Sequence, residues 1–181
     1  MNTANKLTIL RIILVPVFMV FMMMEGVAWN TIALILFILA SVTDWLDGYI
    51  ARSRNQITTF GKFMDPLADK MLTTAAFVVL VAGGRMSAWA LMLVLVREFM
   101  VSGIRLSAAS GGKVIAASMF GKIKTVSQMV AIIAAILLRY PVFPQETAVL
   151  ITEILIWIST VATVLSGIDY VAKNWSLLEL E

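Results

Sequence analysis

The chain has 181 residues, of which 61% are hydrophobic and 14% are charged, and its formal net charge is +3. Soluble domains are about 45–50% apolar and about 25% charged, so this composition predicts an integral membrane protein and argues against a soluble domain. The sequence has no cysteine and no histidine, which excludes disulfides, thiolate chemistry and the usual general base.

Six apolar segments are long enough to cross a membrane as helices, which takes roughly 20 residues each. They cover about 7–24, 31–52, 66–83, 87–109, 121–140 and 147–172, and a short N-terminal juxtamembrane segment precedes the first. The connections are short and polar, and none resembles a linker between domains. The sequence therefore predicts one all-α membrane domain over residues 1–181, with six transmembrane helices.

Lysine and arginine are distributed unevenly between the two sides of this predicted bundle. If the N-terminus, the second and fourth connections and the C-terminus share one side, that side carries twelve of the fourteen basic residues. The other side has only Arg85 and Arg139. Short loops rich in lysine and arginine stay in the cytoplasm, so both termini are expected to be cytoplasmic. Some of these basic residues would contact anionic lipid headgroups.

Four aspartates lie at the facing ends of the second and third segments. Asp44 and Asp47 are three residues apart, and Asp65 and Asp69 are four apart, so each pair shares one face of a helix. A short reversal between the helices would bring the two acidic faces together. Four carboxylates in one place repel strongly unless cations neutralise them, and their charge matches two divalent ions. Oxygen ligands favour ions such as Mg²⁺ or Mn²⁺, as in two-metal phosphoryl-transfer sites.

Pro66 fits the first turn of the third predicted helix, where its missing N–H is not needed. A structural alternative for the aspartates is that they cap helices or pair with nearby basic residues, namely Arg52, Arg54, Lys62 and Lys70. Four aspartates at helical spacing on apolar segments favour a functional site, because ionisable groups within a membrane are functional candidates by default.

The motif in this stretch reads Asp44-x2-Asp47-Gly48-x2-Ala51-Arg52-x8-Gly61-x3-Asp65-x3-Asp69. It resembles the signature of the CDP-alcohol phosphotransferases at every defined position. The resemblance implies a homodimer of six-helix subunits, a site for two divalent cations formed by the four aspartates, and Asp69 as the general base that deprotonates the acceptor alcohol. It also implies a set of CDP-diacylglycerol-binding residues: Asn5, Thr8, Arg11, Gly48, Ala51, Arg52, Thr58 and Gly61. A plainer alternative makes Asn5 and Thr8 helix-start residues and Arg11 an interfacial anchor.

A second group of basic residues lies in residues 97–125. A cation deep in an apolar helix favours an anionic partner, and a phosphate on the acceptor would supply one. The predicted acceptor-phosphate ligands are Arg97, Arg105, Lys122, Lys124 and Thr125. Alternatively, these cations bind lipid headgroups or pair with Glu98 and the aspartates.

The amino-acid sequence of residues 3–16, 43–70 and 97–125 resembles one branch of the family, the bacterial phosphatidylglycerophosphate synthases. That implies transfer from CDP-diacylglycerol to sn-glycerol 3-phosphate, at a cytosol-facing site in the bacterial inner membrane. Membrane lipids are expected partners and nucleic acid is not. Two alternatives stay open: a related enzyme with another phosphorylated acceptor such as inositol phosphate, and a divalent-cation carrier that uses the aspartates as its ion path.

Overall fold

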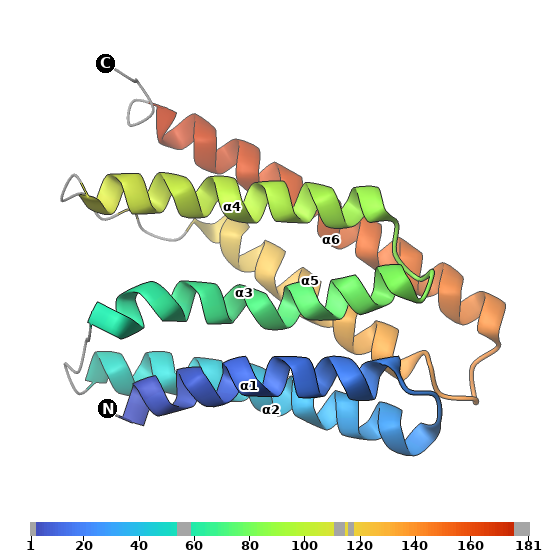
Figure 1. Cartoon of the computed structure of the whole chain (residues 1–181). Helices are drawn as coiled ribbons and strands as arrows, with labels where there is room; N and C mark the ends of the chain where they lie inside the picture. The colour runs from blue at the N-terminus through green and yellow to red at the C-terminus, as the bar shows by residue number, and fades with distance from the viewer. Residues whose placement is uncertain (1–2, 54–58, 111–114, 116–117, 176–181) are drawn as a thin grey trace.

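The computed structural model describes residues 3–53, 59–110, 115 and 118–175, and this part of the chain is helical with short connections (Figure 1). Side chains are described for residues 7–43, 67–68, 70–109, 115 and 118–175. The helices are α1 (Thr3–Met23), α2 (Val27–Ser53), α3 (Thr59–Ala82), α4 (Ala88–Ser110), α5 (Met119–Leu137) and α6 (Gln145–Lys173). The predicted all-α class is confirmed.

Each predicted segment corresponds to one helix, but the start of α3 was predicted wrongly. The helix begins at Thr59, so Pro66 lies inside α3 and not in its first turn, and residues 59–63 are helical and not part of the reversal. Proline removes one helical hydrogen bond, yet the rest of the backbone must still be hydrogen-bonded where water is scarce, which favours continuing the helix through it. Pro16 is likewise tolerated inside α1.

Successive helices run in opposite directions, so the bundle has two distinct ends. The start of α1, the end of α2, the start of α3 and the end of α4 lie together on the left in Figure 1; we call this the motif end. The turns after α1, α3 and α5 lie at the opposite end. Helix α1 packs against α2 and α3, and α6 packs against α4 and α5.

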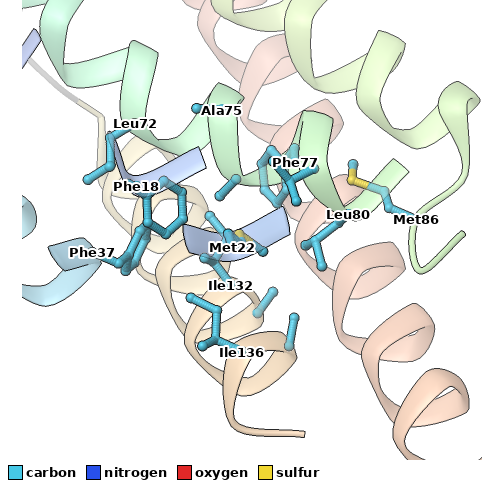
Figure 2. Packing of buried hydrophobic residues seen from close by; sticks show 14 of the residues in the cluster. Phe18, Met22, Phe37, Leu72, Ala75, Phe77, Leu80, Met86, Ile132 and Ile136 are labelled. Atoms are coloured by element: carbon cyan, nitrogen blue, oxygen red, sulfur yellow. The ribbon is translucent and has the colours of Figure 1, made fainter. Parts of the chain in front are cut away.

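The main apolar core takes residues from all six helices, most of them from α1, α2, α3 and α5 (Figure 2). The rings of Phe18 and Phe37 meet with centroids 5.7 Å apart, and Phe77 and Ile132 are buried in the same cluster. In contrast, all six helices expose large apolar side chains on the outside of the bundle. A soluble monomer rarely exposes so much apolar surface, so this outer surface suits a lipid environment.

Two helices of the described chain, α5 and α6, are long and apolar enough to cross a membrane by length and composition. Shorter apolar stretches of 10–17 residues lie within α1, α2 and α3, at Leu7–Met23, Val27–Thr43 and Lys70–Ala82. The six helices are therefore observed, while six membrane crossings and cytoplasmic termini remain predictions.

Candidate active site

Helices α2 and α3 bring the four motif aspartates to the same end of the bundle. Asp44 and Asp47 lie near the end of α2, and Asp65 and Asp69 lie near the start of α3. Because both helices are continuous there, each pair shares one helical face, as predicted from the spacing. The side chains of these aspartates lie outside the described residues. The same holds for other predicted ligands: Asn5, Gly48, Ala51, Arg52, Thr58 and Gly61.

A divalent cation at this end would need oxygen ligands from the motif. Among the side chains that the structure describes, no three acidic residues come together in a group that could hold a metal ion. The motif aspartates lie on the end of α2 and the start of α3, which are consecutive in the chain and lie at the same end of the bundle. Their carboxylates are hard oxygen ligands, which suit Mg²⁺ or Mn²⁺. The four carboxylates are therefore the type of ligand that the predicted metal ions prefer.

A cavity of about 510 Å³ lies at the motif end, between α1, α2, α3, α4 and α5. Its wall contains all five residues that the sequence predicts to bind the acceptor phosphate: Arg97, Arg105, Lys122, Lys124 and Thr125. Arg11 and Lys70 also line it, and Lys70 directly follows the motif residue Asp69 in the chain. The cavity thus adjoins the aspartate motif and collects cations from four helices.

The predicted ligands of the acceptor phosphate differ in how deeply their side chains are buried. Arg97 and Lys124 are 8% and 7% exposed, whereas Lys122 and Thr125 are on the open side of the cavity. The Thr125 hydroxyl donates to the backbone oxygen of Gly121 at 3.0 Å, inside its own helix. A phosphate would therefore have to compete for this donor.

Glu98 is the acidic residue at the centre of these cations. Its carboxylate forms ion pairs with Lys124, with Arg97 at 3.3 Å and with Lys70 at 3.8 Å. It is buried, with 7% of its surface exposed. Among the predicted phosphate ligands, Arg97 and Lys124 thus pair with Glu98, as the alternative interpretation of the sequence had it, and both also line the cavity.

Thr8 and Arg11 of α1 are completely buried, at 0% and 1% exposure. A side chain with that burial does not anchor the chain at a membrane surface, so the interfacial alternative for Arg11 is wrong. Arg11 instead contributes to the cavity wall from α1.

Helix α6 supplies hydrogen-bond partners for Arg97 and Arg105 that were not predicted from the sequence. Ser166 accepts a hydrogen bond from Arg97 Nη2 at 2.7 Å, and Tyr170 accepts one from Arg105 Nε at 3.3 Å. The Arg105 guanidinium also lies 5.6 Å from the centroid of the Tyr170 ring. The signal was present in the sequence as a polar stripe at three- and four-residue steps along an apolar helix: Ser159, Thr163, Ser166 and Tyr170.

Gly167 makes room for Arg97 where α6 crosses α4. A Cβ atom at this position would lie 2.9 Å from Arg97 Cγ and 3.6 Å from Met100 Cε. Contacts below 3.0 Å do not occur without a shift of one partner. The glycine therefore allows the Arg97 side chain to run along α6 to Ser166.

Comparisons with known proteins identify the family of this chain. The family model of the CDP-alcohol phosphatidyltransferases matches residues 1–165. A Bacillus subtilis (strain 168) protein named CDP-diacylglycerol–glycerol-3-phosphate 3-phosphatidyltransferase is 41% identical, over 98% of this chain and 97% of its own. Proteins of the same name from Haemophilus influenzae and Rickettsia typhi are 38% and 35% identical, over 98% and 93% of this chain and 96% and 94% of theirs. The chain belongs to the CDP-alcohol phosphatidyltransferase family and is a transferase of phospholipid biosynthesis.

Proposed function

We propose that this transferase moves the phosphatidyl group of CDP-diacylglycerol to sn-glycerol 3-phosphate, giving phosphatidylglycerophosphate and CMP. The observation that carries the choice of acceptor is the cavity wall, where six cationic side chains face one described carboxylate, Glu98. That excess of positive charge suits an acceptor with its own phosphate, and a neutral alcohol such as serine would not need it. The names of the relatives from Bacillus subtilis, Haemophilus influenzae and Rickettsia typhi specify the same acceptor.

The whole chain, residues 1–181, would form one domain with six membrane crossings in the bacterial inner membrane. The apolar outer surface of all six helices supports this placement. The basic residues are concentrated at the motif end, whereas Arg85 and Arg139 lie at the other, so the motif end would face the cytosol. A water-soluble acceptor can then enter directly from the cytosol. The subunits would pair as homodimers.

The four motif aspartates would hold two divalent ions, Mg²⁺ or Mn²⁺, and Asp69 would also act as the base. When bound, the ions supply positive charge that stabilises the diphosphate and the departing CMP. Asp69 takes the proton from the 1-hydroxyl of glycerol 3-phosphate. The freed oxygen forms a bond to the β-phosphorus, which carries the diacylglycerol. The bond between that phosphorus and CMP breaks, and CMP leaves with the electron pair.

The lipid donor would lie along the predicted CDP-diacylglycerol-binding residues. Arg11 supports this role, because it is buried and belongs to the wall of the cavity next to the motif. Arg52 would lie on the diphosphate. The full proposed set is Asn5, Thr8, Arg11, Gly48, Ala51, Arg52, Thr58 and Gly61.

Arg97 is the best-supported ligand of the acceptor phosphate. Glu98 and Ser166 hold its two terminal nitrogens, at 3.3 and 2.7 Å, so its guanidinium is fixed before any substrate arrives. These two bonds use two of its five N–H donors, and its buried Nε has no hydrogen-bond partner within the described structure. A pre-positioned guanidinium loses little freedom when it binds phosphate. Lys124, Arg105 and Lys122 would complete the phosphate site, with Thr125 at its open side.

The acceptor is tested by measuring CMP release from CDP-diacylglycerol with purified protein and Mg²⁺ or Mn²⁺. We expect release with glycerol 3-phosphate, and release about 10⁴-fold slower with glycerol, because a site built for a polar group rejects an analogue that lacks it. A chelator of divalent cations should stop the reaction. Release with inositol phosphate but not with glycerol 3-phosphate would assign the alternative acceptor. Metal flux in liposomes without CMP release would instead indicate a cation carrier.

Gly167→Ala should raise the KM for glycerol 3-phosphate about tenfold, because the new methyl group displaces Arg97 from Ser166 and loses a charged hydrogen bond. The matched control is Gly103→Ala in α4, where an added Cβ would meet nothing within 4 Å. That control should keep the wild-type KM. An equal KM in the two variants would show that Arg97 does not need the space at Gly167.

A further inference from the structure

A cavity at the end opposite the motif is not used by the proposed reaction. It has a volume of about 560 Å³ and lies where the turns after α1, α3 and α5 come together, on the right in Figure 1. Its wall includes Arg85 and Arg139, which are the two basic residues that the sequence places at this end. Both cations thus contribute to one cavity from different connections.

The guanidinium groups of Arg85 and Arg139 differ in the hydrogen bonds that they donate. Arg139 donates to the backbone oxygen of Met22 and, at 3.1 Å, to that of Met24, so it binds the negative end of α1. Arg85 donates from Nη2 to Gln145 Oε1 at 3.3 Å. Its Nη1 is buried and has no hydrogen-bond partner in the described residues. A buried guanidinium nitrogen without an acceptor is unfavourable and indicates a missing partner.

The electrostatics of the cavity also favour an anion. Burial lowers the pKa of Arg85 and of Arg139, and the charge of Arg85 lowers the pKa of Arg139 further, while Glu25 raises it. The two guanidinium groups are therefore close enough to repel each other. Both remain protonated, because arginine side chains in proteins are effectively always charged. An anion placed between them would remove this repulsion.

Asn30, which lines the same cavity, carries a second buried polar atom without a partner among the described residues. Asn30 is buried, at 3% exposure, and donates from Nδ2 to the backbone oxygen of Ile136 at 2.9 Å. Its Oδ1 is buried and accepts no hydrogen bond within the part of the chain that the structure describes. A ligand that satisfies the whole cavity needs an anionic group for the arginines and a hydrogen-bond donor for Asn30.

From these contacts we infer that the cavity binds a phosphodiester headgroup that carries a hydroxyl or amine. The phosphate lies between Arg85 and Arg139, and the hydroxyl or amine donates to Asn30 Oδ1. Such a group is found on a membrane phospholipid and on a soluble glycerophosphodiester. This second site is separate from the proposed acceptor site, and it holds whether or not glycerol 3-phosphate is the substrate.

The test measures the binding of two probes to the full-length protein in neutral detergent by native mass spectrometry. One probe is dihexanoylphosphatidylglycerol, and the other is glycerophosphoglycerol, which has the same headgroup without acyl chains. Arg85→Gln should weaken the binding of one probe molecule per chain about tenfold or more, because a charged hydrogen bond is lost. Glu25→Gln should strengthen that binding, because it removes the only acidic side chain among the described residues that line the cavity. Equal effects on both probes would assign the headgroup alone, and an effect on the lipid only would assign a membrane lipid.

The charge control is Lys173→Gln, which removes one positive charge at the motif end, where Lys173 forms a surface pair with Asp169 at 2.7 Å. It should leave the binding of both probes unchanged. The result expected for Glu25→Gln cannot be caused by misfolding, because a misfolded variant would not bind the probes more tightly than the wild type. Wild-type affinity for both probes in Arg85→Gln and in Glu25→Gln would overturn the inference.

Discussion

Asp69→Asn should lower the rate of CMP release by about 10²–10⁴-fold, which is the usual contribution of a general base. The asparagine amide has nearly the same size and shape as the carboxylate, but it cannot accept the proton from the acceptor hydroxyl. The KM for glycerol 3-phosphate should change little, because the predicted phosphate ligands lie on α4 and α5. The measurement is kcat and KM for CMP release at saturating CDP-diacylglycerol.

Asp169→Asn is the matched control for this substitution. Asp169 lies on α6 near the motif end, outside the aspartate motif, and pairs with Lys173 at 2.7 Å. Its replacement makes the same chemical change on a residue without a proposed role, so the wild-type rate should be kept. The assignment of Asp69 as base has its own test. If Asp69 only helps to hold metal, excess Mn²⁺ should restore the rate of Asp69→Asn, and such recovery would contradict its role as the base.

The sequence predicted the parts of this molecule that depend on local spacing. The length of the apolar segments placed the six helices, because a helix that crosses a membrane needs roughly 20 apolar residues. The spacing of residues on a helix put Asp44 with Asp47, and Asp65 with Asp69, on shared helical faces. One cavity also collects Arg97, Arg105 and the basic residues of α5. Their sequence separation is short, since α4 and α5 are consecutive in the chain.

Features that depend on which distant helices pack together were not predicted. Helix α6 crosses α4, and this contact makes Ser166 and Tyr170 the partners of Arg97 and Arg105. No local pattern in α4 names its neighbour in α6, although the polar stripe of α6 shows that some buried polar partner exists. The start of α3 was missed for a different reason. Pro66 is a strong local signal for a helix start, and the need to pair backbone groups outweighed it.

Glu98 connects the ion pairs of α3, α4 and α5, and this position makes its substitution informative. Its carboxylate contacts Lys124, Arg97 and Lys70 in a buried setting, where charges interact more strongly than in water. Glu98 also lowers the net positive charge that the acceptor phosphate meets. The Glu98 carboxylate lies among these cations, and a bound phosphate would add further negative charge beside it.

Glu98→Gln should lower the free energy of unfolding by about 3–5 kcal/mol, the usual result of removing one partner from a buried ion pair. For a chain of this size, the thermal midpoint in detergent should fall by on the order of 10 °C. Saturating glycerol 3-phosphate should recover part of this loss and should stabilise the variant more than the wild type, because its phosphate then provides the missing negative charge. The matched control is Glu153→Gln on the exposed face of α6, which should change stability by no more than about 0.5 kcal/mol. Equal midpoints for the two variants would show that Glu98 does not hold the cations together, and equal stabilisation of wild type and Glu98→Gln by the acceptor would show that its phosphate does not bind among them.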